Sequence, residues 1–299
     1  MLRRLILAAA DSRTIRRFVG RYGMRLGASR FVAGETLDEA VLTLRRLNER
    51  GLRTNTTLLG ENVTDSEATR RVVEEYERTL RRIDSEGLQT NVALKLTHLG
   101  VLIDEDLAYA NLERLVVEAA GLGNFIRVDM EDSPLVDVTL RIYRRLREAG
   151  HDNVGTVLQA YLYRTPADLE ALLPLRPNLR IVKGAYNEPP AVAYPSKADV
   201  DAAFRRLVER SVADGGFTAV ATHDEELIDH ALGLGAGPDR LELQMLYGVR
   251  TQLQLDLVRR GHRVLCAAPY GPDWYPYLMR RLAERPANLL FFLRNALRG

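Results

Sequence analysis

Residues 155–183, GTVLQAYLYRTPADLEALLPLRPNLRIVK, contain the pattern that decides the fold. Two short runs, Gly155–Gln159 and Leu179–Lys183, have the length and the Val, Ile and Leu content of buried strands. Between them, Thr165 and Pro166 are typical of the first residues of a helix. A strand, a helix and a second strand in this order predict two parallel strands joined by a helical crossover.

The same alternation continues over most of the chain. Apolar residues at spacings of three and four predict helices over Ala108–Ala120, Leu135–Glu148 and Val200–Ala213. Eight strand–helix units in about 240 residues are typical of a closed (β/α)8 barrel. Besides the two runs above, strand-like runs occur at Thr54–Leu59, Thr90–Lys95, Phe125–Asp129, Phe217–Ala221, Leu241–Met245 and Arg263–Ala268.

An open, doubly wound sheet is the alternative arrangement of such units. The sequence has no G-x-G-x-x-G pattern after its first strand and no Walker A sequence, so the barrel is favoured. We expect one α/β barrel over residues 51–299, preceded by a helical arm over residues 1–50.

The composition indicates a sizeable core and no dominant charge. Of the 299 residues, 46% are hydrophobic, and 42 basic residues nearly balance 40 acidic ones, for a formal net charge of +2. This balance gives no support to nucleic-acid binding, which uses a basic surface. The single cysteine, Cys266, excludes an internal disulfide and a thiolate metal site, and it predicts a reducing compartment such as the cytoplasm.

The N-terminal segment, MLRRLILAAADSRTIRRF, imitates a signal peptide. Its apolar run, Leu5–Ala10, is short and charge resumes at Asp11, so an amphipathic helix is favoured. Such a basic helix suits peripheral contact with the inner face of a membrane, and the alternative is a helix packed on the barrel or on another subunit. The arginines concerned are Arg3, Arg4, Arg13, Arg16 and Arg17.

Polar residues collect where the predicted strands end. Barrel enzymes form their sites at the C-terminal ends of the strands, because the following loops meet there. Singly, each such residue has the alternative of a solvated strand end or a structural ion pair, but their convergence on one rim predicts a site. The rim residues are Lys95, Asp129, Gln159, Lys183, Thr222, His223 and Gln244.

Four residues near the C-terminus fall on one helical face. Tyr277, Arg280, Arg281 and Glu284 follow one another at helical spacing. Two adjacent guanidinium groups suit a carboxylate or a phosphate, because each can donate two parallel hydrogen bonds, and Glu284 is placed to hold one of them. The alternative for this motif is a salt-bridged surface helix.

Seven motifs, in order along the chain, resemble those of the proline dehydrogenase family. The resemblance runs from roughly Val32 to the C-terminus, and it is stronger to the short monofunctional bacterial members than to the long bifunctional ones. The motifs are KLTHLG from Lys95, RVDMEDSP from Arg127, VLQAYLYR from Val157, LRIVKGAY from Leu179, ATHDEELI from Ala221, LQMLYGVR from Leu243 and YLMRRLAERPAN from Tyr277.

The resemblance implies a distorted (β/α)8 barrel that binds FAD non-covalently over the strand ends. It implies oxidation of L-proline to 1-pyrroline-5-carboxylate by hydride transfer to the flavin, the first step of proline catabolism. It also suggests a membrane quinone as the electron acceptor.

Residue roles follow from the same resemblance. Asp129 orients the arginine pair and Arg180 lies beside the flavin, and these two are the implied catalytic residues. The implied substrate-binding residues are Lys95, Tyr186, Leu246, Ala267, Tyr277, Arg280 and Arg281. The implied flavin contacts are Met130, Gln159, Arg180, Lys183, Gly184, Ala185, Thr222, His223, Gln244 and Glu284.

Two positions depart from the family pattern. Ala267 stands where the family usually has a tyrosine that packs against the substrate ring, and Thr57 stands where an acidic residue usually precedes LLGE. Alanine leaves space for a larger or more polar ring, so hydroxyproline or another substituted cyclic amino acid is the alternative substrate. A third hypothesis is a barrel that binds an acidic metabolite without redox chemistry.

Overall fold

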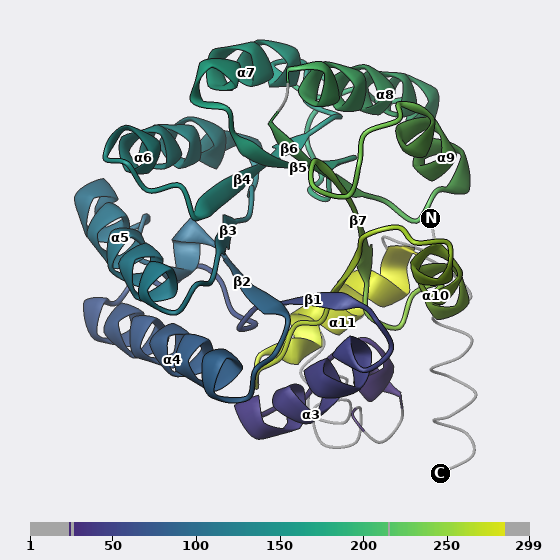
Figure 1. The fold of residues 1–299 in the computed structure, drawn as a ribbon. Coiled ribbons are helices and arrows are strands. Elements are labelled where there is room, and N and C mark those ends of the chain that lie inside the picture. Colours follow the sequence, from purple (N-terminus) through teal and green to yellow (C-terminus); the bar gives the residue numbers. More distant parts are fainter. Residues whose placement is uncertain (1–23, 25–26, 215, 285–299) are drawn as a thin grey trace.

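Eight parallel strands close into a barrel in the structure, a computed structural model that describes residue 24, residues 27–214 and residues 216–284 (Figure 1). Side chains in the last helix are described up to residue 279. Each strand pairs with the next, and the eighth pairs with the first. The strands are β1 Arg53–Thr56, β2 Thr90–Leu94, β3 Ile126–Val128, β4 Val154–Gln159, β5 Asn178–Val182, β6 Phe217–Ala221, β7 Leu241–Leu246 and β8 Val264–Ala267.

Helices surround the strands (Figure 1). Short 3-10 helices occupy Ala28–Arg30, Leu96–His98, Ser133–Leu135 and Leu173–Leu175. The α-helices are α3 Leu37–Asn48, α4 Ser66–Ser85, α5 Glu105–Gly121, α6 Val136–Glu148, α7 Thr165–Leu172, α8 Lys197–Ala213, α9 Glu225–Gly233, α10 Thr251–Arg259 and α11 Trp274–Glu284.

The structure confirms the (β/α)8 fold and all eight predicted strands. Strand β6, Phe217–Ala221, has the predicted bounds, and the others differ by a residue at one or both ends, except β1. Strand β1 ends at Thr56, whereas the prediction extended it to Leu59. The apolar residues beyond Thr56 have other roles. Leu58 forms an isolated bridge with Tyr270, and Leu59 packs in an apolar cluster separate from the main core, called the second cluster below. The buried residues of the second cluster are Ala28, Phe31, Val32, Leu59, Val249, Trp274, Tyr275, Leu278 and Met279.

Several helix starts are fixed by local hydrogen bonds. The Thr36 side chain accepts from the Glu39 backbone N–H, and the Glu39 carboxylate accepts from the Thr36 N–H, which forms a capping box before α3. Asp65 and Asp104 accept from the third residue after them and so begin α4 and α5. These caps set the lengths of the loops between strand and helix, and those loops form the C-terminal rim of the barrel.

Two helices give the barrel its distortion. Helix α3 precedes β1 in the chain, yet it stands in the outer ring between α10 and α4 (Figure 1). Its buried face belongs to the main core. Helix α11 follows β8 but packs in the second cluster, with Leu59 from the loop after β1 and Val249 from the loop after β7. Because both loops leave the C-terminal ends of their strands, α11 lies over that end of the barrel.

Part of the predicted N-terminal arm packs on the barrel. Helix α3 falls within residues 1–50, and its residues Leu44 and Leu47 are buried in the main core. Residues 1–23, including the basic segment, lie outside the described residues. The division of the chain at residue 51 therefore stays a prediction.

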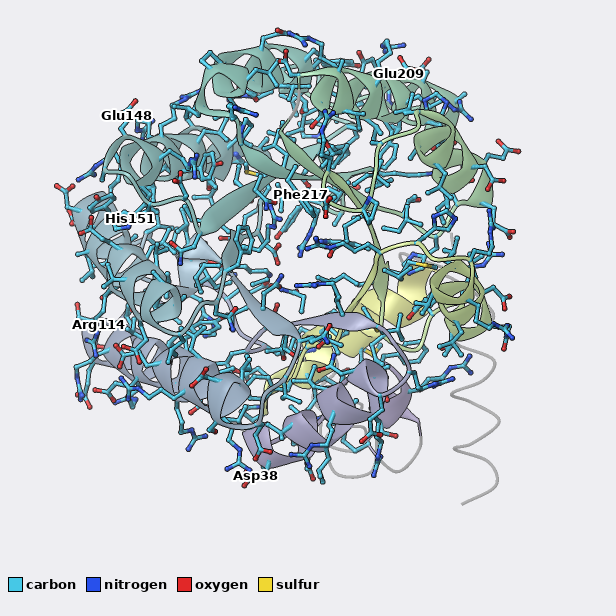
Figure 2. All side chains as sticks on the ribbon, viewed as in Figure 1. Asp38, Arg114, Glu148, His151, Glu209 and Phe217 are labelled. Atoms are coloured by element: carbon cyan, nitrogen blue, oxygen red, sulfur yellow. The ribbon has the colours of Figure 1, made fainter. Side chains whose placement is uncertain are left out.

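The barrel interior contains charged and amide side chains that bond to one another. Successive side chains of a strand point to opposite faces, and Figure 2 shows side chains from several strands projecting into the middle of the barrel. Arg180 of β5 contacts Gln244 of β7, and Arg127 of β3 contacts Asn178 of β5. Since another strand separates the partners in each pair, both contacts must cross the interior. Polar side chains inside a barrel that is surrounded by apolar packing favour a ligand-binding site at one end of the barrel.

The segment before α3 packs closely against the loop after β7, and a substitution at Gly248 in that loop tests this contact. Gly248 has a φ of 74°, and a Cβ there would lie 1.7 Å from the Arg30 carbonyl oxygen. Gly235 has a φ of 70° and open space around its Cβ position. We expect Gly235→Ala to cost about 1 kcal/mol of unfolding free energy, from the left-handed backbone alone.

We expect Gly248→Ala to cost on the order of 2 kcal/mol more than Gly235→Ala, because the backbone of Arg30 must also shift. Urea unfolding of the two variants and the parent protein measures the difference. Equal midpoints for the two variants would show that the contact between Gly248 and Arg30 is not tight in solution.

Candidate active site

Arg180 lies at the centre of the polar rim. Its Nε donates to Gln244 Oε1 at 2.5 Å, and its Nη1 donates to Asp129 Oδ1 at 2.6 Å. Only 11% of the Arg180 side chain is exposed. A planar guanidinium group held by two different acceptors has one orientation. The structure therefore brings together three predicted site residues, Arg180 within β5, Gln244 within β7 and Asp129 directly after β3.

Lys95 follows β2 and forms an ion pair with Glu61 from the loop after β1. The pairing with Glu61 does not follow from the sequence, although Glu61 belongs to the LLGE motif. The ring of His98 supports this loop, since a Cβ on Gly60 would lie 2.6 Å from its Nε2. Burial, together with the nearby Lys95, lowers the pKa of His98 to about 4, so the ring is a neutral packing element.

The loops after β3 and β4 are tied to each other. The Gln159 amide nitrogen donates to the Glu131 carbonyl oxygen at 2.8 Å, and Thr165 Oγ1 donates to the Gln159 carbonyl oxygen at 2.5 Å. The Glu131 carboxylate accepts from the Thr97 hydroxyl at 2.6 Å. Burial raises the pKa of Glu131 above its usual value. The predicted contacts Met130 and Gln159 therefore lie in a rigid part of the rim.

Lys183 follows β5 and lies between two carboxylates. Its ammonium nitrogen is 2.6 Å from Asp201 Oδ1 and 2.9 Å from Asp224 Oδ2. The hydrogen bond from Lys183 lowers the pKa of Asp224 below its usual value. Lys197, on the exposed side, contacts the same two carboxylates. An ammonium group has three N–H donors, so these two carboxylates leave Lys183 with capacity for another acceptor.

The ends of β6 and β7 are joined by His223. Its Nε2 accepts from the Leu246 backbone N–H at 2.9 Å, which requires that this nitrogen be unprotonated. Thr222 is buried next to it, and its hydroxyl accepts from the Asp224 N–H at 3.2 Å. These contacts fix the backbone at Leu246, whose side chain is partly buried against the second apolar cluster.

The segment after β5 folds back over the end of β4. The Tyr163 N–H donates to the Val192 carbonyl at 3.0 Å, and the Tyr194 N–H donates to the Tyr161 carbonyl at 2.8 Å. At Gly184, φ is 124° and a Cβ would lie 2.3 Å from the Tyr161 ring. This glycine therefore permits close packing of the rim itself. Ala185 and the half-buried Tyr186 follow directly.

Ala267 lies at the end of β8, partly exposed, and pairs in register with Leu246 and Asn55. Tyr270 does not fill the space beside it, because its hydroxyl bonds Thr79 at 2.6 Å and lies 3.1 Å from Glu75, both on α4. Tyr275, on α11, is buried in the second cluster.

Helix α11 supplies the remaining predicted residues. Tyr277 packs beside the same cluster as Leu246, so the helix lies near the ends of β7 and β8. The predicted helix is confirmed for Trp274–Glu284. The side chains of Arg280, Arg281 and Glu284 lie outside the described residues.

Comparison with known proteins identifies the family. The sequence matches the family described as Proline dehydrogenase over residues 40–294. It is 42% identical over 307 residues to "Proline dehydrogenase" of Deinococcus radiodurans, which covers 100% of this chain and 99% of that protein. The chain belongs to the proline dehydrogenase family.

Other proline dehydrogenases give the same result. "Proline dehydrogenase 1" of Bacillus subtilis (strain 168) is 40% identical over 302 residues, with 100% of both chains covered. Among solved structures, proline utilization A (PutA) from Bdellovibrio bacteriovorus, inactivated by N-propargylglycine, has a TM-score of 0.80 at 23% identity. That match covers 86% of this chain and 32% of the other, and it supports the barrel fold.

Two other classes of site, a membrane-spanning helix and a metal centre, are absent from the described part of this proline dehydrogenase family member. Within the described residues, no helix is long and apolar enough to cross a membrane. The same residues include no group of three or more His, Cys, Asp or Glu side chains arranged to hold a metal ion. Cys266 is buried in the core, where it packs as a small apolar residue, and burial raises the pKa of its thiol to about 12.

The contact between Asp129 and Arg180 predicts a measurable loss of stability. Asp129→Ala removes one of the two acceptors of a mostly buried guanidinium group, and we expect a loss of about 2 kcal/mol of unfolding free energy. Glu74→Ala is the matched control, because it removes a carboxylate from the exposed pair Arg70–Glu74 on α4. We expect that control to change stability by less than about 0.5 kcal/mol. Similar losses in the two variants would mean that Asp129 does not hold Arg180.

Proposed function

We propose that this chain oxidises L-proline to 1-pyrroline-5-carboxylate, with non-covalently bound FAD as the hydride acceptor. The observation that carries the proposal is the similarity of about 40% identity, over whole chains, to proteins named proline dehydrogenase. The reaction is the first step of proline catabolism. The family match gives no support to a barrel that binds a metabolite without redox chemistry.

The substrate carboxylate would bind at the open end of the barrel. Lys95 projects from the end of β2, and Arg280 and Arg281 lie on α11, which crosses that end. Three cations can anchor one carboxylate, and this would fix the position of the ring carbon that loses the hydride. Tyr186, Leu246 and Tyr277 would supply walls for the apolar ring. Asp129 would orient the arginines, as the family resemblance implies.

The rim has a donor set suited to FAD. Lys183, with a third N–H donor, is suited to a phosphate, and Gln159, Thr222, His223 and Gln244 provide polar contacts at the ends of consecutive strands. Met130, Gly184, Ala185 and Glu284 complete the proposed contacts. When bound, FAD supplies the acceptor for the hydride. Arg180 contributes a fixed positive charge, which stabilises negative charge that develops beside it.

We further propose a quinone as the final electron acceptor and a cytoplasmic location, with peripheral contact at the inner face of the membrane. The basic segment Arg3–Arg17 supports this contact by its charge. Vesicle sedimentation, with and without anionic lipid, distinguishes membrane contact from packing of this segment on the protein.

The visible absorption spectrum of the purified protein tests the proposed cofactor. We expect oxidised-flavin bands, and we expect heat denaturation to release FAD into the supernatant. A colourless protein that stays colourless after incubation with FAD would contradict the proposal. That result would favour the non-redox barrel.

We predict that Lys183→Ala weakens FAD binding about tenfold or more, because a charged donor to the phosphates is lost. Lys197→Ala is the matched control, since Lys197 contacts the same two carboxylates but is 75% exposed. We expect the control to retain FAD. FAD content after dialysis measures both, and full occupancy in Lys183→Ala would show that Lys183 does not bind the cofactor.

We predict that Arg280→Ala and Arg281→Ala each lower kcat/KM by the equivalent of roughly 2–4 kcal/mol, with a raised KM for proline. FAD content should change little. Arg259→Ala on α10 is the control, because Arg259 and its partner Asp256 are both exposed. Near-normal kcat/KM in either variant would remove that arginine from the proposed carboxylate site.

The selectivity for the substrate ring tests the role of Ala267. Ala267→Tyr should restore an aromatic wall and raise the efficiency for proline by a factor of roughly 5–30. The same ring should crowd a hydroxyl substituent, so the ratio of proline to hydroxyproline efficiency should rise. The comparisons give no independent support to hydroxyproline as the substrate. An unchanged ratio in a folded, FAD-loaded variant would show that Ala267 does not face the substrate.

A further inference from the structure

A buried carboxylate inside the barrel has no part in the proposed chemistry. Glu242 lies on β7, two residues before Gln244, and is 2% exposed. It accepts from Arg263 Nε at 2.7 Å and from Gln244 Nε2 at 2.7 Å, and Arg53 Nε lies 3.8 Å away. Burying an ion is costly even when it is paired. A carboxylate in this place therefore needs an explanation.

Glu242 determines which way the Gln244 amide points. An amide can turn either its oxygen or its nitrogen toward a neighbour, and the two ends have nearly the same shape. The Glu242 carboxylate only accepts hydrogen bonds, so it selects the amide nitrogen. The amide oxygen then faces Arg180 Nε, which only donates. With this orientation, every donor in the chain of contacts meets an acceptor.

The hydrogen-bond chain extends through the barrel. Arg263 donates to Glu242, Gln244 donates to Glu242, and Arg180 donates to both Gln244 and Asp129. Glu242 and Gln244 lie on β7 and Arg180 lies on β5, whereas Arg263 immediately precedes β8 and Asp129 follows β3. A change at Glu242 can therefore reach Arg180 through one intervening side chain.

The charges around Glu242 give it a second possible role. Arg53 and Arg263 face it directly, and Arg127 is close enough for Glu242 to raise its pKa, although burial and Arg180 together lower that pKa to about 9. Glu242 could thus serve only to balance these arginines. Such a role would not require contact with Gln244, and the two roles predict different results when both residues are changed.

We propose that Glu242 is a positioning residue: by fixing the orientation of the Gln244 amide, it aims the Arg180 guanidinium at the open end of the barrel. The inference rests on the proposed function in one respect, that Arg180 acts beside the reacting carbon. The link from Glu242 through Gln244 to Arg180 rests on the contacts alone.

A double-mutant cycle tests the proposal. Glu242→Gln keeps the shape but can donate, so the Gln244 amide is able to turn and present its nitrogen to Arg180. We expect kcat to fall about tenfold, equivalent to the loss of one well-oriented interaction. The KM for proline should stay within about twofold, since the proposed carboxylate contacts Lys95, Arg280 and Arg281 are not altered, and kcat is measured at saturating FAD because Gln244 is also a proposed flavin contact.

The double variant distinguishes the two roles. If Glu242 acts through Gln244, then Glu242→Gln combined with Gln244→Ala should have the same kcat as Gln244→Ala alone. Fold losses that multiply would overturn the proposal, and so would an unchanged kcat in folded Glu242→Gln. Arg53→Gln is the control, because it removes the distant cation and leaves both hydrogen bonds of Glu242. We expect its kcat to stay within about twofold.

Two additions make the test decisive. If Glu242→Gln does not fold, Glu242→Asp keeps the charge but withdraws it from Gln244, and the same loss of kcat is expected. The same cycle can be measured by urea unfolding. The shift of the unfolding midpoint in the double variant should differ from the sum of the shifts in the two single variants. If the parent protein lacks FAD or proline turnover, the proposed function fails, and the urea cycle still supports or overturns the link from Glu242 to Gln244.

Discussion

The structure depends on the position of Arg180 between Asp129 and Gln244. The two acceptors come from opposite sides of β5, and each is separated from it by another strand. The inward curvature of the barrel brings these three side chains together on its inner face. Closure also buries the guanidinium group, and burial makes its hydrogen bonds strong and its orientation definite. The charge at the centre of the proposed site is therefore a consequence of barrel geometry.

The same geometry explains the unusual place of the last helix. Helix α3 fills the outer ring beside β1, so α11 is able to lie over the C-terminal end of the strands (Figure 1). A helix in that place can bring cationic side chains to a ligand that also contacts the strand ends. The rim residues then hold each other, as Lys183 is held by Asp201 and Asp224. Preorganised contacts of this kind reduce the cost of ordering on binding.

The sequence alone predicted the eight strands, the barrel and the rim, because strand composition and helical spacing are local patterns. It did not predict the partners of the rim residues. The ion pair of Lys95 with Glu61, and the contacts of Glu242, join segments whose side-chain directions depend on closure and register. The predicted C-terminal end of β1 was wrong, because the apolar residue Leu59 packs in the second cluster and does not belong to the strand.

The most direct test of the account is anaerobic mixing of the purified, FAD-loaded protein with L-proline. We expect the oxidised-flavin bands to bleach and pyrroline carboxylate to form in an amount equal to the flavin. This result requires the carboxylate anchors, Arg180 and the cofactor to act in one site. Bands that persist with L-proline, but bleach when dithionite is added, would show a reducible flavin that proline does not reach. That outcome would contradict the account.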